Sequence, residues 1–246
     1  MAEALGADVT LVTRLTSTFD RSSLAGFELR SYPAARMVRY QNSYDRAGNR
    51  TQLLLDAGEP LEPGMMECER SADAFILAPA YHEVADWPFP CARVRGVSLQ
   101  GILRDVDSSQ RVRPRTGAVA AAMPFVHNGV VAFFSEEDTP SPEALGREIA
   151  AVAGARAIIT RGYRGAIVFE GETLTAHPAL PALAVDPTGA GDCFSTAYIV
   201  RFAETRDHAS AMRFALSAGA LSVEAPGISG IPTRAAIEQR LEMVAA

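Results

Sequence analysis

The chain has 246 residues, of which 48% are hydrophobic and 21% are charged, so it is long and apolar enough to bury a large core. Its formal net charge is −6 and its pI is near 5.3, which argues against a nucleic-acid partner because such partners bind basic surfaces. At about 150 residues per domain the length falls between one and two domains, and we expect a single domain over residues 1–246.

The cysteines and histidines form no disulfide or metal-binding pattern. Cys68, Cys91 and Cys193 are far apart without a C-x-x-C pair, and the four histidines have no H-x-x-x-H spacing, as expected in a reducing cytoplasm. The N-terminus has no basic segment followed by an apolar run. The most apolar stretch, 117–134, is interrupted by Pro124 and polar residues, so it is not expected to cross a bilayer. These features predict a cytoplasmic protein without a membrane partner.

All 23 residues in the lysine-plus-arginine count are arginines. A Walker A loop uses a lysine to reach the phosphates, and Schiff-base enzymes use a lysine as nucleophile. Both classes are therefore excluded. If the protein binds a nucleotide, glycine amides, arginines and a metal ion must hold the phosphates.

Short apolar runs alternate with helical patterns along the chain. Between residues 27 and 56, short strands are expected at 36–41 and 51–55, with a turn at 45–49. A helix is expected at 143–153. Strands that alternate with helices predict an α/β fold with three layers around a mostly parallel sheet. Further strands are expected at 8–13, 74–79, 95–99, 128–134 and 166–170, and all of them except 166–170 are expected to be buried in the core.

Residues 186–192, Asp-Pro-Thr-Gly-Ala-Gly-Asp, follow the apolar run 183–185. This order predicts the end of a strand, a tight glycine turn and the start of a helix. Glycines let the backbone approach a ligand, and the amides of a first helical turn form an anion site with the helix dipole. The carboxylate of Asp192 would repel a phosphate there, so its presence indicates a base that accepts a proton from a hydroxyl attacking phosphorus. The alternative is a structural glycine turn capped by an aspartate. The full seven-residue string favours a functional site over this alternative.

The segment after this motif is apolar on nearly all sides. Phe194, Tyr198 and Phe202 recur at helical spacing. We expect this helix to be buried, which would fix its N-terminus and the anion site. Asp207 and Thr233 are expected to cap the two following helices.

With Cys193 and Phe194 the motif completes the pattern D-[TP]-T-G-A-G-D-x-F. It resembles the C-terminal signature of the PfkB/ribokinase family of carbohydrate and nucleoside kinases, and the resemblance extends less sharply over residues 5–241. It implies a ribokinase-like three-layer α/β/α sandwich with a small β-lid at 27–56, which closes over the sugar and can form a homodimer contact. In the family a first strand and a Gly-Gly/Asn segment precede the strand at 8–13, and this sequence has no counterpart of them.

The resemblance also implies the residues of a phosphoryl-transfer site. Asp192 is expected to be the catalytic base and to bind the acceptor. Residues 100–104, Gln-Gly-Ile-Leu-Arg, resemble a loop of the inositol-kinase-like branch, so Gln100 and Arg104 are expected to bind substrate, because arginine suits hydroxyl-rich or phosphate ligands. A surface arginine is the alternative. The amides expected to form the anion hole are those of Gly189, Ala190 and Gly191.

Two further segments resemble the nucleotide and metal sites of the family. Residues 135–138 replace an acidic N-x-x-E motif by Ser-x-x-Asp, so Glu137 and Asp138 are expected to orient Mg²⁺, with a solvated acidic helix start at 136–143 as the alternative. A monovalent cation is expected near Asp186.

The 224–232 loop is expected to border the adenine pocket. The residues expected to bind nucleotide, from a T-x-G-x-x-G spacing and this loop, are Thr160, Arg161, Gly162, Gly165 and Gly227.

The leading interpretation is an ATP- and Mg²⁺-dependent kinase that transfers the γ-phosphate to a hydroxyl of a sugar or polyol. A nucleoside kinase of the same family is one alternative. A nucleotide- or sugar-binding protein without catalysis is another, suggested by the missing N-terminal segment. The helix dipole is expected to favour the ionised form of Asp192, so Asp192 would be a modest base. Its main contribution to catalysis would then be to position the acceptor hydroxyl.

Overall fold

The computed structural model describes residues 1–44, 50–66, 72–84 and 92–245. Cys68, Cys91 and the turn predicted at 45–49 lie outside the described residues. Among the residues described, no helix combines the length and the apolar character needed to cross a membrane.

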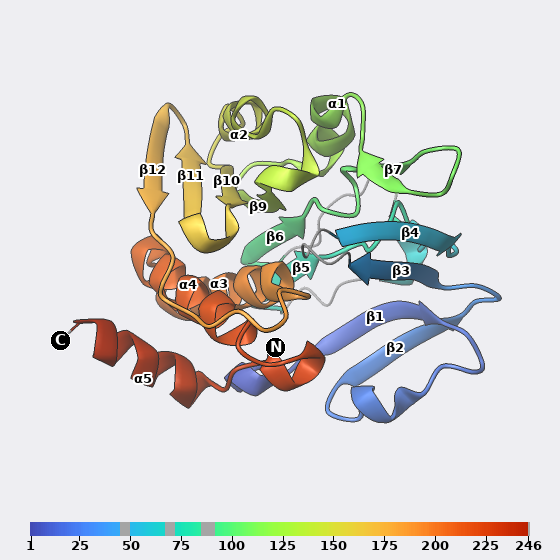
Figure 1. Ribbon diagram of the computed structural model, residues 1–246, viewed down its shortest axis with the longest axis horizontal. Coiled ribbons are helices and arrows are strands. Elements are labelled where there is room, and N and C mark those ends of the chain that lie inside the picture. The colour runs from blue at the N-terminus through green and yellow to red at the C-terminus, as the bar shows by residue number, and fades with distance from the viewer. Residues whose placement is uncertain (45–49, 67–71, 85–91, 246) are drawn as a thin grey trace.

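A six-stranded sheet forms the centre of the fold, in the order β12-β11-β10-β9-β6-β5 (Figure 1). The pairs from β5 to β10 are parallel, whereas β11 and β12 are antiparallel to their neighbours. The predicted mostly parallel sheet is therefore confirmed. Its strands are β5 (Ala74–Leu77), β6 (Val94–Ser98), β9 (Val130–Ser135), β10 (Arg156–Thr160), β11 (Ala166–Glu170) and β12 (Thr173–His177).

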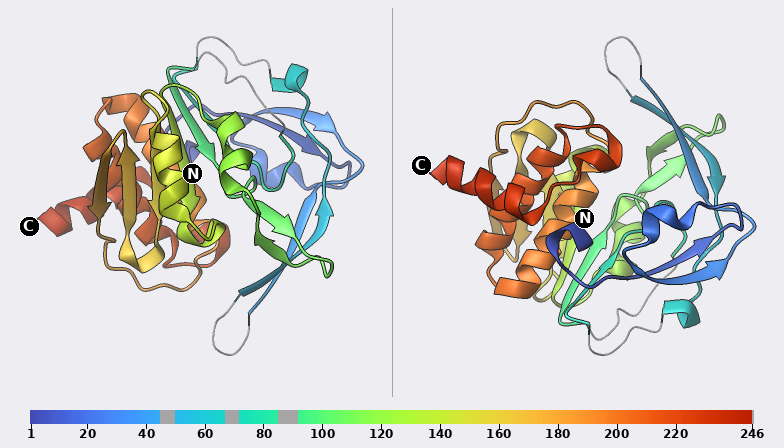
Figure 2. Two further views of the ribbon diagram at one scale, coloured as in Figure 1. Left: turned by 90° about the horizontal axis from the view of Figure 1, so that it is seen from above. Right: turned by 90° about the horizontal axis from the view of Figure 1, so that it is seen from below.

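Helices cover both faces of this sheet, which gives the three expected layers (Figures 1 and 2). One face carries α1 (Ala118–Ala122) and α2 (Pro142–Ala150), and the other carries α3 (Ala190–Thr205) and α4 (His208–Ser222). α5 (Arg234–Ala245) packs on α4. Asp207 accepts a hydrogen bond from the Ala209 amide, and Thr233 accepts one from the Ala236 amide, so both predicted caps are confirmed. Short 3₁₀ turns lie at Glu3–Leu5 (η1), Arg21–Leu24 (η2), Pro63–Met66 (η3), Met123–Phe125 (η4), Glu136–Asp138 (η5), Gly162–Arg164 (η6) and Gly227–Gly230 (η7).

The central strands are apolar on both faces because side chains alternate across a sheet. In β9, Phe133 faces the α3–α4 layer while Phe134 faces α2, and both are buried. Ile158 and Ile159 divide in the same way in β10. Continuous apolar runs in the sequence therefore become strands between two helical layers.

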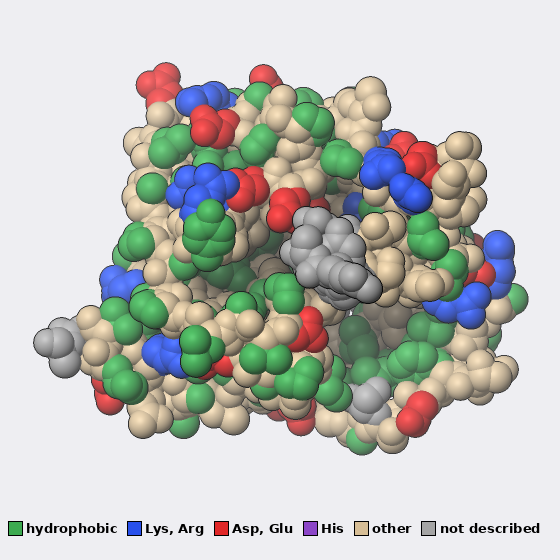
Figure 3. All heavy atoms as spheres, in the orientation of Figure 1, with side chains coloured by type: hydrophobic (Ala, Val, Ile, Leu, Met, Phe, Trp, Pro, Cys, Tyr) green, Lys and Arg blue, Asp and Glu red, His purple; other side chains and the backbone are tan. Residues whose placement is uncertain are grey.

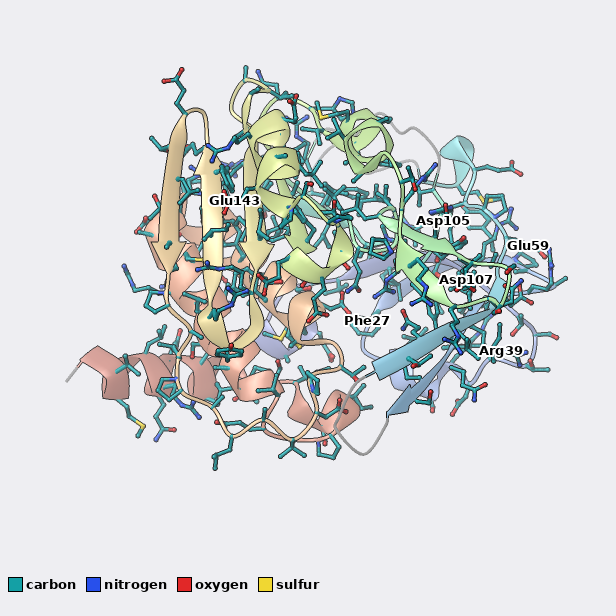
Figure 4. The ribbon with its side chains drawn as sticks, turned by 45° about the horizontal axis from the view of Figure 1, so that its top comes forward. Phe27, Arg39, Glu59, Asp105, Asp107 and Glu143 are labelled. Carbon is teal, nitrogen blue, oxygen red and sulfur yellow. The ribbon has the colours of Figure 1, made fainter. Side chains whose placement is uncertain are left out.

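A second group of strands lies beside the central sheet. β3 (Val38–Tyr44) and β4 (Arg50–Ala57) form an antiparallel hairpin, as the sequence predicts for 36–41 and 51–55. β7 (Arg104–Val106) and β8 (Val112–Pro114) form a second antiparallel hairpin. A bridge between Leu53 and Arg111 joins this β7–β8 hairpin to β4. Figure 4 shows this hairpin, with Asp105 and Asp107, beside the strand that carries Arg39.

The strand predicted to be buried at 8–13 differs from the prediction. β1 spans Thr10–Leu15 and pairs in parallel only with β2 (Glu28–Pro33), outside the central sheet. Within it, Leu15 alone is buried. Its threonines and Arg14 suit a half-exposed strand, because the few apolar side chains can cover only one side of it.

A polar cluster joins the two sides of the α3–sheet interface. The His208 ring stacks on Phe202 with centroids 3.8 Å apart, and its Nε2 contacts the guanidinium of the buried Arg156. Because arginine can only donate, Nε2 must accept, which leaves Nδ1–H to donate to the Tyr198 hydroxyl at 2.5 Å. Arg156 also forms an ion pair with Glu170. Burial and the Arg156 charge lower the pKa of His208 to about 4, while Glu170 and Asp207 oppose this shift.

This cluster predicts a pH-dependent stability. The folded state favours neutral His208. The contribution of His208 to the free energy of unfolding is therefore complete above its ordinary pKa of 6.5 and is lost as the pH falls towards 4. The free energy of unfolding should decrease by up to roughly 3 kcal/mol over this interval. Urea denaturation between pH 7 and pH 4 measures it, with His208→Gln as the control whose curve should be flatter. Parallel curves for the two proteins would contradict the assignment.

Candidate active site

The motif at 186–192 forms a turn that leads into α3. Contrary to the prediction, residues 183–185 are not a strand end but an exposed loop, in which the Val185 and Asp186 amides both donate to the Val223 carbonyl, at 2.7 and 3.1 Å. The loop follows two prolines, Pro178 and Pro181, which lack the N–H that a sheet ladder requires. It therefore runs along the end of α4 instead of entering the sheet.

Asp186 connects this turn to the 224–232 loop. Its carboxylate accepts one hydrogen bond from the Thr188 amide and one from the Gly227 amide, each 2.9 Å long. These backbone bonds, that from Thr188 first, lower the pKa of Asp186. The negative charge at the predicted cation position is therefore fixed, and the two loops expected to border the nucleotide are held together.

Gly189 and Gly191 line the open side of the α3 N-terminus. Gly189 is the N-cap residue with a φ of 81°, a left-handed conformation that favours glycine. A Cβ atom on either glycine would meet no other heavy atom within 4 Å, so the space above the turn is free for a ligand. α3 is buried along Phe194, Ala197, Tyr198 and Ile199, as predicted, which fixes the position of its first turn.

The amides of this first turn differ in what they already bind. The Ala190 amide donates to the Pro187 carbonyl at 3.2 Å, and the Cys193 amide donates to the Gly189 carbonyl at 2.9 Å. In the part of the chain that the structure describes, the Gly191 and Asp192 amides donate no backbone hydrogen bond, as is typical of a first helical turn. Of the three amides predicted to form an anion hole, that of Ala190 thus already donates a hydrogen bond within the turn.

Asp192 faces Arg104 across the site. Solvent reaches its side chain, but the surrounding protein raises the pKa of its carboxyl group, and the charge of Arg104 opposes this effect. The expectation that the helix dipole holds this group ionised is therefore wrong in direction, because desolvation by the neighbouring protein outweighs the charges that favour the carboxylate. A raised pKa makes Asp192 a stronger base than a free aspartate.

Arg104 and Gln100, both predicted substrate residues, lie beside Asp138. Burial raises the pKa of Asp138, whereas the Ser135 amide, the Arg104 charge and the Gln100 side chain lower it. A cavity of about 250 Å³ opens at this point, and the same face of the molecule is hollowed beside the part that carries β1–β4 (Figure 3). The residues that line the cavity are Gln52, Gln100, Leu103, Arg104, Val112, Arg113, Pro114, Ser135, Glu137 and Asp138.

Glu137 and Asp138 lie at the end of β9 with different surroundings. Asp138 is buried, and its Oδ2 accepts a hydrogen bond from the Ser135 amide at 2.7 Å in a capping box. Glu137 is exposed. Among the described residues, no group of three or more His, Cys, Asp or Glu side chains is arranged to hold a metal. Mg²⁺ needs only one or two carboxylates besides water and phosphate oxygens, so these two residues fit it.

The segment predicted to contact nucleotide phosphates is a turn between β10 and β11. The Arg161 amide donates to the Gly165 carbonyl at 2.7 Å, and the Thr160 hydroxyl lies 3.5 Å from the Phe134 carbonyl. A Cβ on Gly165 would lie 2.0 Å from the His177 carbonyl oxygen, whereas one on Gly162 would be in open space. Gly165 is therefore explained by packing within the chain, and only Gly162 leaves room for a ligand.

Arg161 has an unused donor in this turn. Its Nε is buried without a hydrogen-bond partner among the described residues, while the other arginine of the turn, Arg164, is paired with Glu136. A buried donor without an acceptor is unfavourable, so Arg161 is suited to an incoming oxygen ligand.

Sequence reasoning missed the contributions of the neighbouring strands. Tyr40 on β3 places its ring 5.4 Å from the Arg104 guanidinium carbon, and Gln52 on β4 lines the cavity. The alternating pattern of 36–41 predicts the strand but gives no sign of what its side chains contact. The structure thus places Asp192, Arg104, Gln100 and Asp138 around one region.

Residues 120–234 match the family described as pfkB family carbohydrate kinase. The chain is 40% identical over 101 residues to the ribokinase of Bacillus subtilis strain 168, which covers 41% of this chain and 34% of that protein. It is 36% identical over 88 residues to the ribokinase of Lactococcus lactis subsp. lactis strain IL1403, covering 35% of this chain and 29% of that one. The matched part thus spans about a third of the length of these relatives.

Solved structures resemble almost the whole chain. Arabidopsis thaliana ribokinase complexed with ribose and ATP aligns with a TM-score of 0.70 at 19% identity, over 97% of this chain and 83% of that one. A pyrophosphate-dependent kinase in the ribokinase family, complexed with a pyrophosphate analog and myo-inositol, aligns with a TM-score of 0.73 at 17% identity, over 98% and 87%. At these identities the likeness establishes the fold, and the predicted ribokinase-like fold is confirmed.

Proposed function

We propose that the chain, whose residues 120–234 match the pfkB family of carbohydrate kinases, transfers the γ-phosphoryl group of ATP to a hydroxyl of a sugar or polyol. The observation that supports this most is the position of Asp192. Its carboxylate lies in the first turn of a buried helix, beside free amides and facing Arg104. A base and an anion site thus occur together, as phosphoryl transfer to an alcohol requires.

In this proposal Asp192 orients the acceptor hydroxyl and takes its proton. The hydroxyl oxygen forms a bond to the γ-phosphorus while the bond between that phosphorus and the bridging oxygen of ADP breaks. The amides of Gly191 and Asp192, which have no backbone acceptor in the described chain, stabilise the charge on the transferred group together with the N-terminus of α3. The raised pKa of Asp192 suits it to accept the proton.

Glu137 and Asp138 would hold Mg²⁺ through their carboxylates, in part through water. When bound, the ion neutralises charge on the phosphates. Arg104 would supply positive charge, and this charge acts on both Asp138 and Asp192. In a chain without lysine, arginines, amides and a metal ion are the groups left for this task.

The donor would lie along the 160–165 turn and the 224–232 loop. Ile228 and Val185 are 81% and 64% exposed, and the hydrogen bond from Gly227 to Asp186 holds their loops together. Exposed apolar side chains at this point offer a surface for the base of a nucleotide. The unpartnered Nε of Arg161 would bind a phosphate oxygen. Solved relatives in complex with ATP or ADP support this donor.

For the acceptor, the cavity favours a sugar or polyol over a nucleoside. Its side chains offer amides, carboxylates and guanidinium groups that bind hydroxyls, and among the described residues its lining includes no aromatic side chain on which a base would stack. Ribose and myo-inositol occur in solved relatives. A nucleoside kinase also belongs to those relatives, so nucleosides are the comparison to test. Residues 27–56, which include β2, β3 and most of β4, would act as the lid within one domain.

Asp186 allows a prediction about donor binding. Replacing it by alanine removes both acceptors that hold the Thr188 and Gly227 amides. We expect the KM for ATP to rise by roughly tenfold, because a lost charge-assisted hydrogen bond is worth about 1.5 kcal/mol. The KM for the acceptor should change little. An unchanged KM for ATP would show that the two loops do not need this connection.

The proposed function is tested by ADP release from ATP with a panel of pentoses, hexoses, cyclitols and nucleosides. Pyrophosphate replaces ATP in a second series, followed by phosphate release. Turnover with ATP and a sugar or polyol is the expected result. Turnover with nucleosides alone would favour the nucleoside kinase. Ligand binding by calorimetry without product from any acceptor would instead indicate a binding protein without catalysis.

A further inference from the structure

Tyr40 connects the β3–β4 hairpin to the site at two points. Its hydroxyl donates a hydrogen bond to the Ala80 carbonyl at 2.8 Å, and its ring lies against the Arg104 guanidinium, 5.4 Å from centroid to carbon. Ala80 lies in the loop that follows β5, and Arg104 begins β7. The two contacts therefore hold the hairpin against loops at the edge of the central sheet.

The local backbone places Tyr40 for this role. The register of the β3–β4 pair shifts between Arg39 and Tyr40 and leaves Leu55 of β4 without a partner, and such bulges bend the pair and increase its twist. Tyr40 is half-buried although it comes from an outer hairpin, and burial raises the pKa of its hydroxyl group. The phenol is therefore a protonated donor at neutral pH, as the hydrogen bond to Ala80 requires.

Arg104 is held on its other side as well. The His82 ring Nε2 lies 2.7 Å from the Arg104 carbonyl oxygen, so it donates, and the ring stacks on Tyr81 with centroids 4.1 Å apart. The backbone of Arg104 is thus fixed by the core. In the described part of the chain its guanidinium forms no ion pair within 4 Å, although its charge acts on both Asp192 and Asp138. The ring of Tyr40 and a hydrogen bond between its hydroxyl group and the Arg104 side chain set the direction of the guanidinium, and the remaining N–H groups point to a role in binding a ligand.

We propose that Tyr40 is a positioning residue that couples the closed hairpin to the acceptor site by holding the Arg104 guanidinium between Asp192 and Asp138. The proposal rests on the function proposed above. When the hairpin lies against the core, the ring of Tyr40 covers one face of the guanidinium and leaves its edge for the acceptor hydroxyls. When the hairpin moves away, Arg104 loses this support, and the site binds the acceptor poorly.

Tyr40→Leu tests the proposal, because leucine keeps an apolar side chain but removes both the ring and the hydroxyl. We expect the kcat/KM for the acceptor to fall roughly 10- to 100-fold, mainly through KM, since the cation–π contact and the hydrogen bond are lost together. The KM for ATP should stay within about twofold. Tyr40→Phe keeps the ring, so its loss should be smaller than that of Tyr40→Leu.

Tyr32→Leu is the matched control. Tyr32 on β2 also donates its hydroxyl to a backbone carbonyl, that of Met65 at 3.0 Å, but it has no contact with Arg104 among the described residues. Because Tyr32 belongs to the same predicted lid, we expect its acceptor KM to rise, but clearly less than that of Tyr40→Leu. If Tyr32→Leu weakened acceptor binding as much as Tyr40→Leu does, the proposal would be overturned, because any disturbance of these strands would then have the same effect as the loss of the contact with Arg104.

A double-mutant cycle with Arg104→Met shows whether Tyr40 acts through Arg104. In the Arg104→Met background, Tyr40→Leu should have less than about a threefold further effect on kcat/KM. If the two losses multiply instead, Tyr40 does not act through Arg104 and the proposal fails.

Hydrogen–deuterium exchange separates this proposal from the proposed function. Amides of β3 and β4 should exchange faster in Tyr40→Leu and Arg104→Met than in the wild type and Tyr32→Leu, whether or not the protein is a kinase. Equal exchange in all four proteins would overturn the coupling. A wild type without turnover on any donor and acceptor would contradict the kinase function, and exchange would still decide the role of Tyr40.

Discussion

Replacing Asp192 by alanine is expected to lower kcat by roughly 10²- to 10⁴-fold, the usual effect of losing a positioned general base. The reason is that in our proposal the carboxylate, whose pKa is raised by the surrounding protein, accepts the proton of the acceptor. Binding of ATP should survive, because the first-turn amides that would bind the phosphoryl group in our proposal belong to the backbone. Steady-state ADP release and calorimetric titration with ATP measure the two effects.

Asp192→Asn and Asp207→Ala provide the controls. Asparagine keeps the shape of the side chain without its basicity, so its kcat should fall nearly as far as that of alanine. Asp207 caps α4 through the Ala209 amide, so its loss should reduce the free energy of unfolding by about 1 kcal/mol and leave kcat near the wild-type value. Near-normal turnover of Asp192→Ala would remove this residue from the mechanism.

Replacing Gly165 by alanine is expected to destabilise the protein by roughly 3 kcal/mol or more, a loss typical of severe backbone strain. The residue has a φ of 86° and a ψ of −131°, a conformation essentially limited to glycine. An added Cβ would also lie 2.0 Å from the His177 carbonyl oxygen and 2.5 Å from the Ala179 amide nitrogen. Both are backbone atoms, which cannot move aside as a flexible side chain can.

Gly162→Ala in the same turn is the matched comparison. Its φ is 54° and a Cβ there would meet nothing within 4 Å, so the left-handed conformation alone should cost about 1–2 kcal/mol. Urea denaturation of both variants measures the difference. In our proposal Gly162→Ala affects the KM for ATP, because its open side faces the donor. Equal destabilisation by the two changes would contradict the packing role of Gly165.

The sequence alone predicts much of the fold and the central motif. The apolar runs that become β9 and β11 are continuous because both faces of these strands are covered, and such runs can be recognised from neighbouring residues alone. The helix after Asp192 is apolar all round, so its burial follows from composition. The caps at Asp207 and Thr233 are also local, since each acceptor lies two or three residues from its donor.

The site depends more on tertiary structure. Thr160 to Gly165 and the 186–192 motif are visible as patterns, but the pattern does not distinguish Gly162 from Gly165. The difference arises because β12 returns beside the turn and brings the His177 carbonyl against Gly165. The expected direction for the Asp192 pKa is wrong for a similar reason: a helix dipole is read from local sequence, whereas desolvation depends on what packs around the carboxyl group.

What the sequence by itself determined is the alternation of several central strands with helices, the glycine turn at 189–191 and the carboxylate that follows it, because each depends on neighbours within a few residues. Only the tertiary structure decided that β1 pairs with β2 outside the central sheet, and that the charge of Arg104 acts on both Asp138 and Asp192 while Tyr40 lies against its guanidinium. These arrangements join segments far apart in the chain, and such contacts depend on how layers pack, which no local pattern of residues encodes.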